Sequence, residues 1–388
     1  MPPIREFLAL TDQQRDIQQL ARDFAATELA PHAAAWDRDA HFESALVPRL
    51  GDLGFLGMLV PEAYDGMALD AVTYLLVLEE IAAADASTAV MLSVHNSLPS
   101  QMLLAHATEA QRERFLRPMA RGELLGAFAL SEPDAGSDAS GVRTQATRDG
   151  DTYVLNGTKA WVTQGSSAGV ILAMARTDTP GARVGGRGIS AFIVTPDLPG
   201  FVVGKKEDKM GLRASPTVQI VFDNLRVPAD QLLGEPGHGL VYALRSLAHG
   251  RLGIAAQAVG IGRAALGYAV AYAAERRQFG KAIREFEAIQ FKLADMATRL
   301  TQARAVLYAA AAAMDRGESI GQLSSMAKLT ASEMAMWVTT QAIQVFGGYG
   351  YIKDFPVERL FRDAKVTEIY EGTSEIQRLV IARELYAD

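Results

Sequence analysis

The chain has 388 residues, of which 49% are apolar, and it carries a net charge of -7 with six histidines and no cysteine. An acidic chain gives no electrostatic reason to bind nucleic acid or an anionic membrane surface. Without cysteine, disulfides, zinc-thiolate sites and cysteine-ligated iron-sulfur clusters are excluded. The histidines show no metal-ligand spacing, so we expect no metal site and look to an organic cofactor for any redox chemistry.

The N-terminal third has an all-helical pattern. Thr11 and Gln14 form a capping-box pair ahead of apolar residues at helical spacing, which predicts a helix that stops before Pro31. Helical patterns follow at residues 71–84, 87–107 and 109–119. No signal-peptide pattern opens the chain, and no apolar run reaches the roughly 20 residues of a membrane span. We therefore expect a cytoplasmic protein without membrane insertion.

The middle third changes to a strand pattern. Residues 126–234 contain runs of β-branched and aromatic residues separated by turns, and Asp149-Gly150 predicts a hairpin. The glycine-rich segment 177–188 is expected to be the least ordered part of this region.

The last third is helical again. From Phe286 to Leu307, apolar residues recur at steps of three and four, which indicates helix-on-helix packing. Together with the long patterns at 240–274 and 323–346, this predicts a bundle of about four helices. Residues 260–265 match the dinucleotide motif GxGxxA, but they lie inside a helical pattern and do not follow a strand, so we interpret them as small residues for close packing.

The segment RDAKVTEIYEGTSEIQR, residues 362–378, places Glu371 in a loop just before a helix. Thr373 and Ser374 offer hydroxyl groups at the N-terminus of that helix. Apolar residues at helical spacing are expected to bury one of its faces: Ile376, Leu379 and Val380. On this stretch alone, the simpler interpretation of Glu371 is an acid favoured by the helix dipole.

Two motifs resemble the signatures of the acyl-CoA dehydrogenase family. ALSEPDAGSDASG, residues 129–141, meets every constrained position of the first signature, and QVFGGYGYIKDFPVERLFRD, residues 344–363, matches the second. The resemblance extends over essentially the whole chain. It is strongest over residues 254–383 and closest to the short-chain and short branched-chain members.

The resemblance implies an α+β fold in three parts: a helical domain at 1–122, a barrel-like or orthogonal β domain at 123–234, and a four-helix bundle at 235–388. It implies an FAD-dependent oxidoreductase acting on the CH–CH group of an acyl-CoA, in fatty-acid β-oxidation or branched-chain amino-acid catabolism. The expected partners are the acyl-CoA, an electron-transferring flavoprotein as electron acceptor, and further copies of the chain in a homotetramer.

In the resemblance, Glu371 matches the family's catalytic base. It would remove the α-proton of the thioester while the β-hydrogen leaves as hydride to flavin N5, giving a trans-2-enoyl-CoA. Burial would raise the pKa of Glu371, and donors to the thioester oxygen would stabilise the developing charge. Those donors would be its own backbone N–H and a ribityl hydroxyl of FAD. Some members carry the base at the position of Gly250, and glycine there leaves Glu371 as the base.

The resemblance also assigns binding positions. Those for substrate are Ser137, Ala248, His249, Gly250, Arg251, Tyr370 and Gly372. Those for FAD within one subunit are Phe128, Ala129, Leu130, Ser131, Gly136, Ser137, Trp161, Val162, Thr163, Thr373, Ser374 and Glu375, with Thr163 near N5 and the helix N-terminus near the pyrophosphate. From a neighbouring subunit come Arg276 and the segment holding Gln344, Val345, Gly347 and Gly348, and Gln278 and Phe279 complete the set.

Two residues depart from the family pattern. Ala248 replaces an aspartate that many short-chain relatives have near the pantetheine. Glu287 stands where relatives have a glutamine that touches FAD, and a carboxylate near a pyrophosphate is unfavourable, so it stays out of the cofactor set.

Several alternatives remain open from the sequence. Taken alone, Trp161 is a core aromatic residue of a strand and Arg251 is a charge on a helix surface. A flavin-dependent acyl-CoA oxidase, or a DNA-associated flavoprotein of the family, would use the same fold. The acyl group depends on side chains near Tyr370 and residues 90–101.

Overall fold

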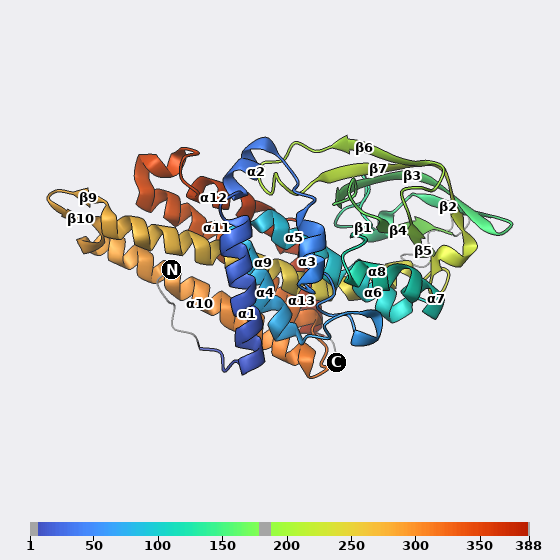
Figure 1. Cartoon of the computed structure of the whole chain (residues 1–388), viewed down its shortest axis with the longest axis horizontal. Coiled ribbons are helices and arrows are strands. Elements are labelled where there is room, and N and C mark those ends of the chain that lie inside the picture. The colour runs from blue at the N-terminus through green and yellow to red at the C-terminus, as the bar shows by residue number, and fades with distance from the viewer. Residues whose placement is uncertain (1–6, 178–187, 387–388) are drawn as a thin grey trace.

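The computed structural model describes residues 7–177 and 188–386. Helices form one end and the centre of the molecule, and the strands gather at the other end (Figure 1). The interior of the segment expected to be least ordered, residues 178–187, lies outside the described residues.

The N-terminal region is helical, as the sequence predicts. Thr11 caps the first helix with both capping-box hydrogen bonds: its Oγ1 accepts from Gln14 N (3.2 Å), and its backbone N–H donates to Gln14 Oε1 (3.0 Å). The pattern expected at 87–107 is divided into two helices, because a second helix begins at Pro99 after its N-cap residue Leu98. The elements are α1 (Asp12–Phe24), η1 (Ala25–Leu29), α2 (Ala33–Asp39), α3 (Leu46–Asp52), η2 (Glu62–Tyr64), α4 (Ala71–Ala84), α5 (Ala86–Ser97), α6 (Pro99–His106), α7 (Glu109–Gln111), η3 (Arg112–Leu116) and α8 (Arg117–Ala120).

The middle region is a mostly antiparallel sheet with the strand order β6-β7-β3-β2-β4-β5-β8, and β1 adds to β4 in parallel. The predicted hairpin joins β2 to β3 with Asp149 opposite Thr152. The elements are β1 (Gly126–Ala129), η4 (Ala139–Gly141), β2 (Gln145–Asp149), β3 (Thr152–Thr163), β4 (Val170–Arg176), β5 (Ile189–Val194), β6 (Phe201–Lys206), β7 (Thr217–Pro228), η5 (Ala229–Gln231) and β8 (Leu232–Leu233).

The C-terminal region consists of long helices joined by short connections. A small β-ribbon, β9 with β10, projects beyond the end of α9, far from the sheet (Figure 1). The elements are α9 (Gly239–Glu275), β9 (Arg277–Gln278), β10 (Lys281–Ala282), η6 (Ile283–Glu285), α10 (Glu287–Asp315), α11 (Gly321–Phe346), η7 (Gly347–Tyr351), α12 (Val357–Lys365), η8 (Val366–Glu368) and α13 (Ser374–Glu384).

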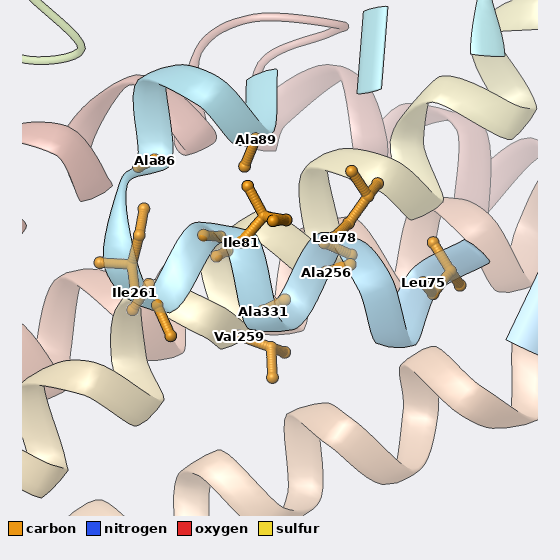
Figure 2. Close-up of a cluster of buried hydrophobic side chains, with 14 of the residues drawn as sticks. Leu75, Leu78, Ile81, Ala86, Ala89, Ala256, Val259, Ile261 and Ala331 are labelled. Carbon is orange, nitrogen blue, oxygen red and sulfur yellow. The ribbon is translucent and has the colours of Figure 1, made fainter. Parts of the chain in front are cut away.

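Helix α9 is the centre of the helical body. Its apolar side chains pack with those of α4, α5 and α11 in one buried cluster, part of which Figure 2 shows. A Cβ added at Gly260 would lie 2.6 Å from the carbonyl oxygen of Glu79 on α4, so glycine here permits close helix packing. By length and composition, α9 is the helix in the described ranges that could cross a membrane, but 72% of its apolar window is buried inside the protein.

Candidate active site

Glu371 lies in the tight loop between η8 and α13. Its φ is +52° and that of Gly372 is +95°, so two successive residues adopt left-handed backbone conformations. Glycine accepts this region freely, whereas it is unfavourable for a residue with a side chain, and such strain concentrates at functional sites. Thr373 then caps α13 by accepting a hydrogen bond from Ile376 N (3.4 Å). Glu371 therefore precedes the helix and is not an acid of its first turn.

The Glu371 carboxylate is enclosed against α9. A Cβ at Gly250 would overlap its Oε2 atom and lie 2.9 Å from its carboxyl carbon, so the carboxylate occupies the space that glycine leaves. Both carboxylate oxygens are buried, and neither has a hydrogen-bond partner among the described residues. Burial raises the pKa of Glu371 to about 7, against the opposing effects of Lys328 and Arg251.

Two side chains hold the backbone of this loop. Lys328 Nζ, on α11, donates a hydrogen bond to Gly372 O (2.6 Å). Gln377 Nε2, on α13, donates to Gly372 O (2.8 Å) and to Glu371 O (3.2 Å). The carbonyl groups of both left-handed residues are thus held by buried side chains.

Arg251 is not a surface charge. Its side chain is 9% exposed on α9, and Nη1 donates to Ser325 Oγ (3.1 Å) on α11. Ser325 in turn donates to Gly321 O (2.9 Å). The guanidinium group is therefore fixed one residue after Gly250, on the side of the site that α11 forms.

Polar side chains pack along α9 beside Glu371. Tyr370 donates its hydroxyl hydrogen to Oε1 of Gln257, and the amide nitrogen of Gln257 donates to Ala86 O (2.8 Å). One turn from Gly250, a Cβ at Gly253 would overlap Ser93 Oγ and lie 3.0 Å from the hydroxyl oxygen of Tyr74. Side chains of α4, α5 and α9 thus occupy the volume along α9 beyond the carboxylate.

The remaining expected substrate positions lie on α9 and in the loop after β1. Ala248 and His249 are half-buried on α9, and His249 Nδ1 is buried without a partner in the described part of the chain. Ser137 is exposed in the loop after β1. Glu132 anchors that loop, because its carboxylate accepts from Thr144 N (3.0 Å) and from the buried Lys159 Nζ (2.7 Å).

The expected cofactor positions of the β domain lie where the chain after β1 meets β3, since Ala160 N donates to Ser131 O (2.9 Å). Trp161 is 63% exposed and has a φ of +60°, at a register irregularity between β3 and β7. It is therefore not a core aromatic residue, and its ring is available to a ligand. Thr163 and Phe128 are half-buried, whereas three neighbours are buried and can offer only backbone groups: Ala129, Leu130 and Val162.

The cofactor positions assigned to a neighbouring subunit lie near the β9–β10 ribbon and η7, at the end of the molecule that is far from the sheet (Figure 1). Phe279 is 93% exposed, and Arg276 lies over the ring of Tyr349, 5.5 Å from its centroid. Val345 is buried, while others are exposed: Gln278, Gln344, Gly347 and Gly348. One chain does not bring this set to Trp161.

The residues present fit an FAD molecule. A Cβ at Gly136, Gly347 or Gly348 would meet nothing within 4 Å, so these backbones are open to close approach. Ser374 Oγ, at the N-terminus of α13, is buried and has no partner within residues 7–177 and 188–386. A helix N-terminus with a free hydroxyl suits a pyrophosphate, and the exposed Trp161 ring suits a flat heterocycle. Glu287 is exposed at the start of α10.

The prediction that apolar residues form the buried face of α13 is wrong in the single chain. Its buried residues are Ser374 and Gln377, whereas Leu379 is 52% exposed and Ile376 and Val380 are half-buried. The inner face of α13 is polar because Gln377 donates hydrogen bonds to the carbonyl groups of the loop.

Sequence reasoning missed several residues of the site. Lys328, Gln377, Gln257 and Ser325 are all fully buried. The sequence holds a partial signal for Lys328 and Ser325. With Ser324 and Ser332 they follow the helical spacing of a buried face. A lysine at such a position is unusual enough to mark it.

Comparisons with known proteins agree along the chain. Family models match "Acyl-CoA dehydrogenase, N-terminal domain" at residues 11–123, "middle domain" at 127–225 and "C-terminal domain" at 237–386. The chain is 46% identical to "Short-chain specific acyl-CoA dehydrogenase, mitochondrial" of Bos taurus, over 98% of this chain and 92% of that protein.

Solved structures are similar as well. Butyryl-CoA dehydrogenase from Megasphaera elsdenii has a TM-score of 0.95 at 44% identity, covering 99% of this chain and 100% of that chain. A chain of the structure described as "Electron transferring flavoprotein of Acidaminococcus fermentans: Towards a mechanism of flavin-based electron bifurcation" has a TM-score of 0.96 at 43% identity, with 99% and 100% covered.

Proposed function

The chain belongs to the acyl-CoA dehydrogenase family, whose members are FAD-dependent oxidoreductases acting on acyl-CoA, and we propose that it dehydrogenates a short-chain acyl-CoA with Glu371 as the base. The substrate is straight or branched, and the product is the trans-2-enoyl-CoA. The observation that carries the proposal is the buried Glu371 carboxylate, which has both oxygens unpartnered in the described ranges and a pKa of about 7.

The chemistry follows from that carboxylate. Glu371 takes the α-proton through one free oxygen, and the β-hydrogen leaves with its electron pair as the Cα–Cβ double bond forms. Bound FAD supplies the acceptor for that hydride. A base with a pKa near the working pH is ionised in part and still strong enough to accept a proton from carbon.

The Glu371 loop also supports the enolate-like charge that develops on the thioester oxygen. The backbone N–H groups that turn back to Val366 O end with Tyr370 N (3.1 Å). Within the described residues, the next backbone N–H, that of Glu371, makes no hydrogen bond. Because Lys328 and Gln377 hold the carbonyl groups, this N–H stays free to donate to the thioester oxygen. Arg251, fixed on Ser325, holds the wall of the substrate site.

A short acyl group suits the space beside Glu371. Tyr370 and Gln257 are joined across it, and Ser93 and Tyr74 fill the volume over Gly253. A long acyl chain would have to displace these buried and hydrogen-bonded groups, which costs free energy. The relatives named for short-chain and butyryl substrates agree with this size.

The complete cofactor site needs a second copy of the chain. Exposed aromatic and aliphatic side chains gather on the β9–β10 ribbon, η7 and the start of α10: Phe279, Phe291, Tyr349, Tyr351 and Ile352. Burying such a surface favours association. We propose a homotetramer, a dimer of dimers, in which this end of one chain completes the FAD site of another. An electron-transferring flavoprotein is the proposed acceptor of the electrons.

An anaerobic titration tests the function. The visible spectrum of the purified protein is followed while butyryl-, isobutyryl-, 2-methylbutyryl-, isovaleryl- or octanoyl-CoA is added. We expect flavin absorbance to bleach with a four- or five-carbon thioester and hardly with octanoyl-CoA. Bleaching that favours octanoyl-CoA would contradict the short-chain assignment, and a bound flavin indifferent to every thioester would contradict the activity. Rapid reoxidation of the reduced protein by air would favour an oxidase.

A further inference from the structure

Lys328 is a buried cation whose charge the reaction described above does not use. Its side chain is fully buried on α11, and Nζ donates to Gly372 O (2.6 Å), in the loop of the base. Burial lowers its pKa to about 8, against the attraction of Glu371. Taking an ammonium group out of water is costly, and methionine would fill the same position without that cost. The charge therefore needs a use.

We propose that Lys328 is a positioning residue for the dehydrogenation, holding the Glu371–Gly372 loop by its carbonyl oxygen and placing a positive charge behind the base. The inference rests on the proposed function. Its first element is the hydrogen bond, because the left-handed backbone at Glu371 is unfavourable and persists only when its surroundings hold it. Gln377 shares the same oxygen, so the loop has one charged and one neutral support.

The second element is the charge. The titratable groups that face Glu371 or Lys328 come from every neighbouring element: Tyr74 on α4, Arg251 on α9, Lys328 on α11, Glu368 on η8, Tyr370 in the loop and Glu375 on α13. After burial, Lys328 has the largest effect on the pKa of Glu371, ahead of Arg251. Neither cation hydrogen-bonds the carboxylate, so both favour its ionised form while its oxygens remain free for the proton.

The test is the pH dependence of turnover in Lys328→Met and Lys328→Gln. Without the cation, burial of Glu371 is less opposed, its pKa rises, and less of the base is ionised at neutral pH. We expect the acid limb of the kcat profile to move up by about one pH unit in both variants. The rate at pH 7 should fall about fivefold, with recovery towards pH 9. Lys328→Gln can still donate to Gly372 O, so it provides a folded variant that lacks only the charge.

Gln377→Leu is the matched control. It removes the other donor to Gly372 O and changes no charge, so turnover should fall at every pH with the acid limb at its wild-type position. A purely structural Lys328 would give the same pattern as Gln377→Leu. Wild-type acid limbs in both Lys328 variants would therefore overturn the proposal.

A second readout does not depend on turnover. Infrared titration of the holoprotein follows the carboxyl band that Glu371→Gln removes. A higher titration midpoint in Lys328→Met supports the proposal, and an unchanged midpoint overturns it. If no thioester reduces the flavin, the proposed function fails, while this titration still decides whether Lys328 sets the ionisation of Glu371.

Discussion

Two buried carboxylates of the helical body differ in what surrounds their oxygens. Glu79, on α4, accepts from Arg304 Nε (3.0 Å) and Tyr308 OH (2.8 Å) and pairs with Arg263 (3.2 Å). Glu371 has cations nearby but no hydrogen-bond partner in the part of the chain that the structure describes. A carboxylate with direct partners stabilises the fold, whereas one with only distant cations keeps its oxygens free to take a proton.

Glu80 shows that burial alone does not decide the outcome. Burial would raise its pKa, but Arg263 and Arg22 donate to it directly and bring its pKa down to about 2. Glu371, whose carboxylate oxygens are also buried, has its pKa raised to about 7. Direct contact with arginine therefore separates the two cases.

Removing the Glu371 carboxylate tests the functional side of this comparison. We expect Glu371→Gln to keep the fold and the bound flavin but to lose about 10²- to 10⁴-fold in kcat, because the proposed acceptor of the α-proton is removed. Rapid-mixing measurements of flavin reduction would show the loss in the chemical step. The matched control is Glu333→Gln, which removes an exposed carboxylate paired with Arg378 on the neighbouring helix. Near-wild-type reduction in Glu371→Gln would refute the assignment of the base.

Removing the Glu79 carboxylate tests the structural side. Glu79→Gln leaves Arg304 and Arg263 with less compensation in a buried site, and we expect the free energy of unfolding to fall by about 3 kcal/mol. Turnover per folded active site should hardly change. Denaturant unfolding measures the first quantity and active-site titration the second. The control Glu318→Gln breaks an exposed pair with Arg316 and should leave stability unchanged. A Glu79→Gln variant as stable as wild type would mean that these contacts are not worth their desolvation.

The pH dependence of stability should have opposite signs at Glu80 and Glu371. The folded-state pKa of Glu80 is lowered from 4.5 to about 2, so its contribution of about 3 kcal/mol is present above pH 4.5 and lost as the pH falls towards 2. The folded-state pKa of Glu371 is raised from 4.5 to about 7, so it destabilises the fold by up to about 3 kcal/mol as the pH rises from 4.5 to 7.

Urea unfolding between pH 3 and pH 8 checks both signs. Relative to wild type, the free energy of unfolding of Glu80→Gln should increase as the pH falls from 4.5. That of Glu371→Gln should increase relative to wild type as the pH rises to 7. A Glu371→Gln variant that tracks wild type across the whole range would show that the carboxylate is not desolvated in the folded protein.

The sequence predicted the elements of the fold because their signals are local. The capping box at Thr11, the hairpin at Asp149-Gly150 and the apolar spacing of α10 each depend on neighbouring residues. The resemblance carried by the two signatures identified Glu371 as the base. Its position in a loop before a helix was predicted from the residues next to it.

The surroundings of Glu371 could not be predicted in the same way. Lys328 is 43 residues away along the chain and Gly250 is 121 residues away, and only tertiary packing brings them to the carboxylate. The prediction that Leu379 is buried was wrong for a related reason, because apolar spacing does not reveal that Gln377 faces the loop.

Glycine at position 250 provides the finest test, because it acts on the position of the base and leaves its charge unchanged. In Gly250→Ala the new Cβ would overlap Oε2, so the carboxylate must move, and a shift of about 1 Å can cost up to about 100-fold in kcat. Stability should not fall, since alanine is favoured over glycine inside a helix. Gly260→Ala on the same helix should do the reverse, because its Cβ meets the backbone of α4 and lies away from the base. Thermal unfolding and kcat, measured for both variants, would separate packing from positioning along α9. Equal losses of stability in the two variants would show that the space under Glu371 serves the packing of α9 as well as the base.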